Sequence, residues 1–191
     1  LDFNGSFAEG MPTKGNIALV SQSGAMAVAI TDWAYTQDIG FSKIISLGNK
    51  SDIDENDCLE YLKKDPFTEV ILMYLESFVD GPRFMEIAAE LSMEKPLVIL
   101  KAGVSEAGQK AVASHTGSLA GADVAVKTAL KQCGAIRVFT NQGFFDCARV
   151  FSMQPIPKRN KIAIVTNAGG PGVMAADSVA KTHLELAAFS K

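Results

Sequence analysis

The sequence has few of the residues that mark several classes of protein. Its 191 residues include 3 cysteines and 2 histidines. Cys58, Cys133 and Cys147 are odd in number and far apart, so they predict neither a disulfide framework nor a zinc site. We expect them to be small buried hydrophobic side chains.

Long apolar runs and an excess of one charge are also missing. No apolar run approaches the roughly 18 residues that span a bilayer, and the N-terminus lacks the basic-then-apolar order of a signal peptide. The formal net charge is −3 with the signs interspersed, which leaves no basic surface for nucleic acid or for an anionic membrane. Because 48% of the residues are hydrophobic, a real core is expected. These features predict a globular, cytoplasmic protein without nucleic-acid or membrane partners.

Short apolar runs alternate with helical patterns along most of the chain. Strands are predicted over residues 16–20, 41–47, 70–75, 97–100 and 135–139, and helices over 25–35, 58–64, 83–93, 122–133 and 141–153. Five buried strands with intervening helices predict an α/β fold with a flavodoxin-like, doubly wound parallel sheet. Such a sheet binds ligands at the carboxyl ends of its strands.

An acidic run at residues 52–57 precedes the second predicted helix. An EF-hand loop that started at Asp52 would need Gly in place of Asp57 and Glu in place of Lys63, so a calcium site is rejected. Acidic side chains interact favourably with the positive end of a helix dipole. We expect this run to stabilise the start of the helix.

The C-terminal part of the chain repeats the pattern of the N-terminal part. Ile-Ala-Ile-Val-Thr at residues 162–166 matches Ile-Ala-Leu-Val-Ser at 17–21, and each run is followed by a turn of small residues and a helical start. The chain is expected to be a fragment with four parts. These are a linker from a preceding domain at 1–14, a flavodoxin-like domain at 15–154, a linker at 155–159, and a truncated second α/β domain at 160–191, with a second strand at 184–189.

Both turns of small residues are candidate phosphate sites. A helix N-terminus presents free N–H groups and the positive end of the dipole to an anion, and serine hydroxyls add donors. The alternative is that glycine only relieves crowding in a tight turn. Neither turn matches a Walker A loop, and the glycine spacing at 169–172 also differs from the dinucleotide-binding fingerprint. The candidate residues are Ser21, Ser23 and Gly24 in the first turn, and Gly169, Gly170 and Gly172 in the second.

His115 lies in a run of small residues, at 114–121, that leaves an imidazole uncovered and the backbone free to move. Such a histidine is suited to act as a nucleophile that carries a phosphoryl group. A helix predicted to start near residues 118–120 would disfavour a charged ring. Glu76, at the end of a predicted strand, is the candidate carboxylate that orients the ring and stabilises its developing charge. The alternatives are a surface histidine without a role and a solvated carboxylate; for His183 we expect no role.

Six blocks of the sequence, in order, resemble the NDP-forming acyl-CoA synthetases, which include ADP-forming acetyl-CoA synthetase and succinyl-CoA synthetase. The blocks are residues 15–25, 48–50, 75–78, 101–103, 114–121 and 165–172, and the resemblance extends over about residues 8–180. It implies that His115 is the phosphorylated histidine and Glu76 the carboxylate that orients it. It also implies that the two helix N-termini face phosphate. Asn49, in the second block, is a possible substrate-loop residue.

The resemblance implies a reaction in three steps. Acyl-CoA and phosphate give an acyl phosphate and free CoA, the histidine takes the phosphoryl group, and an ATP-grasp domain delivers it to ADP. The implied cofactors are CoA, ATP or ADP, and phosphate, with Mg²⁺ accompanying the nucleotide in the ATP-grasp domain. The implied partners are a small carboxylic acid and the CoA-binding and ATP-grasp domains or subunits, in an oligomer. The alternative is a regulatory or subunit-packing module without catalysis, as in related protein acetyltransferases.

Overall fold

The computed structural model describes residues 11–116 and 123–188, and for His115 and Thr116 it describes the backbone alone. The chain divides into two compact units, Leu1–Gln154 and Pro155–Lys191.

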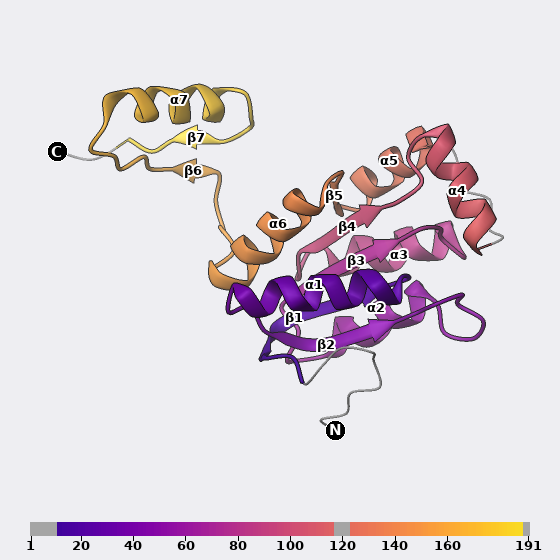
Figure 1. The fold of residues 1–191 in the computed structure, drawn as a ribbon. Coiled ribbons are helices and arrows are strands. Elements are labelled where there is room, and N and C mark those ends of the chain that lie inside the picture. The colour runs from indigo at the N-terminus through magenta and orange to yellow at the C-terminus, as the bar shows by residue number, and fades with distance from the viewer. Residues whose placement is uncertain (1–10, 117–122, 189–191) are drawn as a thin grey trace. The chain divides into compact units, whose positions relative to one another are not determined.

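The first unit is built on a parallel sheet of five strands in the order β2-β1-β3-β4-β5 (Figure 1). This is the flavodoxin-like order, as predicted. The one helix that the sequence pattern did not predict is α4. The elements are β1 (Lys14–Ser21), α1 (Gly24–Thr36), β2 (Phe41–Ser46), α2 (Glu55–Lys64), β3 (Val70–Leu75), α3 (Gly81–Leu91), β4 (Leu97–Lys101), α4 (Glu106–Thr116), α5 (Asp123–Gln132), β5 (Ile136–Val138) and α6 (Asn141–Met153).

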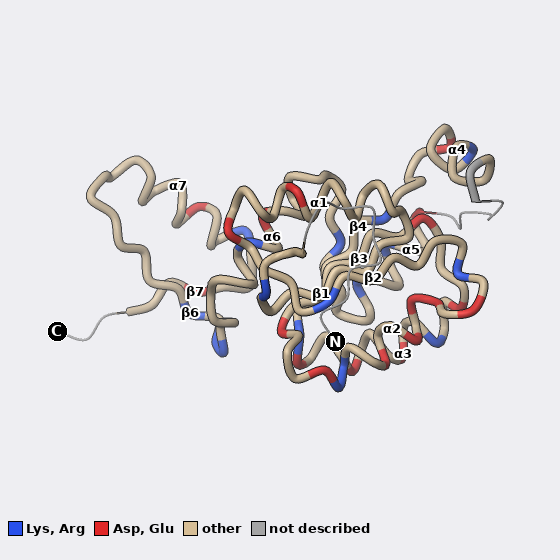
Figure 2. The backbone as a smooth tube through the Cα atoms, turned by 60° about the horizontal axis from the view of Figure 1, so that its bottom comes forward, with Lys and Arg blue, Asp and Glu red and all other residues tan. Residues whose placement is uncertain are grey.

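Helices cover both faces of this sheet, so its strands are apolar on both faces. In β1, Ile17 and Leu19 belong to the core beneath α1 and α6, while Ala18 and Val20 belong to the core beneath α2, α3 and α5. All four side chains are fully buried. Figure 2 shows the strands between the layer of α1 and α6 and the layer of α2 and α3.

Helix α2 begins in the acidic run, and the structure confirms that this run stabilises a helix start. The Asp54 side chain accepts hydrogen bonds from the N–H groups of Asn56, at 2.7 Å, and Asp57, at 3.2 Å. The Asp57 side chain accepts in return from Asp54 N–H at 3.0 Å, which completes a capping box. The bond from Asp54 N–H and the nearby Arg83 guanidinium lower the pKa of Asp57.

The second unit holds β6 (Lys161–Ile162), α7 (Gly169–Ala180) and β7 (Glu185–Leu186), with its two strands paired in parallel. Both strands are shorter than the apolar patterns predict. The reason is that each has a single neighbour in its sheet, whereas β1 pairs with β2 and β3. Beyond the paired residues, Val165 is 94% exposed.

Acidic and basic residues are interspersed over the described chain, without a large surface of one sign (Figure 2). Among the described residues, no helix is both long and apolar enough to cross a membrane.

Candidate functional site

The loops that follow β1, β2, β3 and β4 meet at the carboxyl edge of the first sheet. Backbone hydrogen bonds join them: Leu47 N–H donates to Ser21 O at 2.8 Å, Gln22 N–H to Tyr74 O at 2.9 Å, and Ala102 N–H to Leu75 O at 2.9 Å. The chain order reverses between β1 and β3, and flavodoxin-like folds bind ligands at this point. Residues that the sequence marked as candidates follow both of these strands.

The turn from β1 to α1 leaves open N–H groups at the start of a helix. Ser21 Oγ donates to Ser23 O at 2.6 Å and accepts from Ser23 N–H at 3.2 Å. Ser23 caps the helix by accepting from Met26 N–H at 3.3 Å. The N–H groups of Gly24 and Ala25 have no acceptor among the described residues. An anion fits here, with Gly24 exposed and Ser23 half-buried, whereas the fully buried Ser21 shapes the turn.

Glu76 directly follows β3 and is 9% exposed. Its carboxylate has no hydrogen-bond partner in the described part of the chain, although its backbone is bonded on both sides. Burial and, to a smaller extent, the charge of Glu76 raise the pKa of Tyr74. Glu76 is therefore a nearly buried carboxylate beside the β1–α1 turn, with acceptor oxygens that no other described residue uses.

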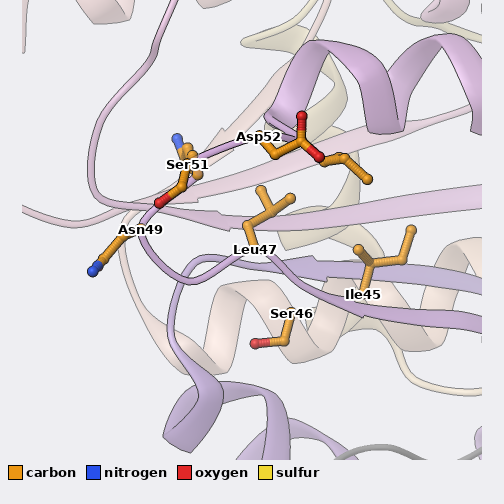
Figure 3. A pocket seen from close by; sticks show the side chains of 8 residues that line it. Ile45, Ser46, Leu47, Asn49, Ser51 and Asp52 are labelled. Carbon is orange, nitrogen blue, oxygen red and sulfur yellow. The ribbon is translucent and has the colours of Figure 1, made fainter.

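Asn49 lies after β2, in the lining of a pocket of about 340 Å³ (Figure 3). The lining combines Ile45 and Leu47 with polar groups that include Ser46 and Asp52. In Figure 3 the Asn49 side chain extends away from Ile45 and Leu47. A Cβ added at Gly24 would lie 3.9 Å from Ser46 Oγ, so this loop borders the β1–α1 turn.

The backbone of His115 lies in the last turn of α4, not in the loop that the sequence predicts. The helix start expected near residues 118–120 lies outside the described residues. The C-terminal end of α4 carries a partial negative charge, which favours a cation, so α4 gives no reason for an uncharged ring. Helix α4 lies beyond the carboxyl ends of the strands (Figure 1). Val112 of α4 packs closely against the backbone of Gly103, which follows β4, because a Cβ at Gly103 would lie 3.1 Å from Val112 Cγ2.

The second turn of small residues repeats the backbone pattern of the first. Thr166 Oγ1 donates to Ala168 O at 3.1 Å and accepts from Ala168 N–H at 3.0 Å. Ala168 stands at the N-cap of α7 and provides no side-chain hydrogen bond. A Cβ at Gly169 or Gly170 would meet no atom within 4 Å, whereas one at Gly172 would lie 3.1 Å from Thr166 Cγ2. The glycines of this exposed turn belong to the second unit.

A family described as the succinyl-CoA ligase like flavodoxin domain matches residues 14–151. The chain belongs to this family. This result confirms both the predicted fold and the predicted resemblance. The match ends shortly before the division between the two units.

Three relatives of this succinyl-CoA-ligase-like chain show where the domain occurs. One is an ADP-forming acetate–CoA ligase of Methanocaldococcus jannaschii, with 46% identity to the chain. The alignment covers the full length of this chain and 27% of that ligase. Another is the alpha subunit of ADP-forming acetate–CoA ligase I of Pyrococcus furiosus, with 47% identity to the chain. That alignment covers 96% of this chain and 40% of the subunit. Acetyl-coenzyme A synthetase 1 of Ca. Korarchaeum cryptofilum, solved with phosphate and ADP, matches 96% of the chain. That match has a TM-score of 0.87 and 38% identity, and covers 40% of the solved chain.

The chain thus spans about a quarter to two fifths of the length of these relatives. In this succinyl-CoA-ligase-like domain, sequence reasoning assigned no role to Gln22 or Lys101. The Gln22 side chain is bonded to the backbone of Glu76 and Ser77, and Lys101 Nζ to the carbonyl of Glu76. Desolvation, followed by the charge of Arg137, lowers the pKa of Lys101 to about 8. A polar residue at the end of an apolar strand was the available signal for Lys101.

Proposed function

We propose that this chain is part of an NDP-forming acyl-CoA synthetase. The enzyme would interconvert acyl-CoA, phosphate and ADP with a carboxylic acid, CoA and ATP, through an acyl phosphate and a phosphohistidine. The observation that carries the proposal is the nearly buried carboxylate of Glu76, which has no hydrogen-bond partner among the described residues and lies beside the open N-terminus of α1. The relatives named as ADP-forming acetate–CoA ligases support it.

His115 would be the nucleophile. A neutral imidazole nitrogen attacks the phosphorus of an acyl phosphate, a P–N bond forms, and the bond from phosphorus to the acyl oxygen breaks. The carboxylic acid leaves as a carboxylate with the electron pair of that bond. The N–H on the other ring nitrogen would be held by Glu76, which stabilises the positive charge that develops on the ring.

The β1–α1 turn would bind the phosphate that reacts. The N–H groups of Gly24 and Ala25 and the hydroxyl of Ser23 would contact its oxygens, with the positive end of α1 behind them. Gly169, Gly170 and Gly172 would form the second phosphate-facing N-terminus. Asn49 would belong to the loop that contacts the acyl substrate.

The remaining chemistry would come from parts of the enzyme outside this chain. A CoA-binding domain would supply acyl-CoA, and an ATP-grasp domain would pass the phosphoryl group to ADP. The Mg²⁺ that accompanies the nucleotide would be held in the ATP-grasp domain, as the family resemblance implies. We propose an oligomeric, cytoplasmic enzyme that acts on a small carboxylic acid.

The test is the intact mass of the full-length protein after incubation with acetyl phosphate, or with acetyl-CoA and phosphate. We expect an acid-labile phosphoryl adduct that His115→Ala abolishes. His183→Ala is the matched control, since it removes the other histidine of the chain, and it should keep the adduct. No adduct with several acyl donors, in folded protein, would contradict the proposal and favour the regulatory module.

A further inference from the structure

The main chain that follows β3 is held by side chains from other loops. Within residues 76–80, three N–H groups and three carbonyls each bond to a side chain that is distant in sequence. These side chains follow β1 or β2, end β4, or begin α2. They are Gln22, Lys50, Glu55, Asn56 and Lys101.

Gln22 holds this segment from the β1 side. Its Oε1 accepts from Glu76 N–H at 2.9 Å and from Ser77 N–H at 3.2 Å. Its Nε2 lies 3.3 Å from Ser77 Oγ, to which it donates. Gln22 is 7% exposed, so these bonds form away from solvent, where an unpaired amide is costly.

Lys101 holds the same peptide from the β4 side. Its Nζ donates to Glu76 O at 2.7 Å and to Ala102 O at 2.5 Å. The parallel ladder between β3 and β4 ends at the pair Leu75 and Lys101, so the carbonyl of Glu76 has no strand partner there. The lysine side chain replaces that missing partner.

Lys50 and Glu55 hold the residues that follow. Lys50 Nζ donates to Ser77 O at 2.6 Å and forms an ion pair with Glu55 at 2.7 Å. Glu55 accepts from Val79 N–H at 2.6 Å. Both side chains are almost fully buried, and Lys50 has a φ of 56°, which is uncommon for a residue with a side chain. The segment is therefore fixed on its far side as well.

Burying the Lys101 ammonium costs folding stability, and the packing of its side chain does not by itself offset that cost. It is 5% exposed, and among the described residues no carboxylate lies within ion-pair distance of its Nζ. Desolvation lowers its pKa to about 8, because the charged form is disfavoured in this position. A methionine would fill a similar volume without that penalty. What the ammonium adds is its pair of hydrogen bonds to main-chain carbonyls.

We propose that Gln22 and Lys101 are positioning residues, which hold the peptide of Glu76 from both sides and so fix where its carboxylate meets the phosphorylated histidine. This inference rests on the proposed function. Misplacing a catalytic group by about 1 Å can slow a reaction by about a hundredfold. The carboxylate is attached to the one peptide that both side chains hold.

The test measures the rate of His115 phosphorylation in the full-length protein, with acetyl phosphate as the probe. Lys101→Met and Gln22→Met remove the hydrogen bonds at nearly constant volume. We expect each to lower the maximal rate by about tenfold to a hundredfold. The acetyl phosphate concentration that gives the half-maximal rate should stay within about twofold, because both side chains are bonded to protein groups and would act through Glu76.

Lys95→Met is the matched control. Lys95 precedes the same strand, and its Nζ also donates to two main-chain carbonyls, those of Leu62 and Asp65, each at 2.8 Å. These carbonyls lie at the opposite edge of the sheet from Glu76. Loss of these two hydrogen bonds should leave the phosphorylation rate within about twofold of the wild type.

A double-mutant cycle separates positioning from general loss of structure. In a Glu76→Gln protein, adding Lys101→Met or Gln22→Met should slow phosphorylation no further, because both act through the carboxylate. Additive losses, or equal losses in Lys95→Met, would overturn the inference while leaving the phosphohistidine in place. If Lys101→Met does not fold, the Gln22→Met half of the cycle decides. An unphosphorylated wild type would instead overturn the proposed function.

Discussion

The chain contains the same βα turn twice, and the two copies have different surroundings. After β1, Ser21 bonds to the N–H and carbonyl of Ser23, and after β6, Thr166 bonds in the same way to Ala168. Each turn is followed by a helix that starts at glycine. These hydrogen bonds are common to the two copies, which differ locally in the helix cap that Ser23 provides and Ala168 does not.

Their neighbours do distinguish them. β1 has a strand on each side, and the residue after Ser21, Gln22, is buried and bonded to the end of β3. β6 has one neighbour, and the corresponding Asn167 is exposed. Only the first turn, among the described residues, has a second strand end within reach of its side chains. Four predictions test this difference between the two turns.

The first unit buries charged side chains, such as Lys101, whereas the described part of the second unit buries none. We expect the largest effect, on the free energy of unfolding, from Lys101. Lys101 has a pKa of about 8 in the fold against an ordinary value of 10.5. Between these values the unfolded chain binds more protons, so the contribution of Lys101 to the free energy of unfolding rises with pH. The difference corresponds to on the order of 3 kcal/mol.

Denaturant unfolding of the wild type and Lys101→Met at a series of pH values would measure this effect. The free energy of unfolding of the wild type should rise relative to that of the variant from about pH 8 to pH 10.5. The Cys58 thiol, whose pKa burial raises to about 11, titrates in both proteins and cancels in the difference. A difference that does not change with pH would show that Lys101 is not desolvated.

Val20 and Val165 occupy matched positions in the two repeated sequence runs, 17–21 and 162–166. Val20 is fully buried, whereas Val165 is 94% exposed. Val20→Ala should lower the free energy of unfolding by about 2 kcal/mol through lost burial and a cavity. Val165→Ala should change it by less than about 0.5 kcal/mol.

The fluorescence of Trp33, the only tryptophan in the chain, can follow unfolding of the first unit, and hydrogen exchange can follow the second. Equal effects of the two substitutions would contradict the difference in burial. A larger effect of Val165→Ala in the full-length protein than in this chain would show that other residues cover the second unit.

Reciprocal substitutions at the N-caps of α1 and α7 should remove the side-chain cap from the first helix and add one to the second. Ser23→Ala removes the side chain that caps α1 and should destabilise that helix by about 1 kcal/mol. Ala168→Ser adds a cap to α7 and should stabilise it by a similar amount. Hydrogen exchange in the first turn of each helix measures both effects, and changes of the same sign would contradict the assignment of the caps.

The smallest expected effect is at Gly170, which corresponds to Ala25 in the first turn. Gly170→Ala meets open space and should stabilise α7 by about 0.5 kcal/mol, because alanine restricts the unfolded chain. Gly172→Ala is the control, since its Cβ would lie 3.1 Å from Thr166 Cγ2. The same measurement of α7 should show a smaller gain or a loss for this control.

The sequence predicted the alternation of strands and helices because apolar periodicity is a local signal. It did not predict α4, whose residues are mostly small or polar and whose one buried side chain among those described is Val112. It marked Glu76 because this residue ends an apolar strand. It assigned no role to Gln22, which lies 54 residues from Glu76, or to Lys101, because contacts over such distances leave no periodic pattern.

Local sequence is enough to form the two turns, because the hydroxyl of Ser21 or Thr166 bonds to the backbone two residues later in both surroundings. Which turn lies beside a buried carboxylate depends instead on the packing of the strands. Parallel pairing places the ends of β1, β3 and β4 at one edge, where Gln22 and Lys101 can reach the peptide of Glu76. That placement depends on the order of strands in the sheet, which connects segments far apart in the chain.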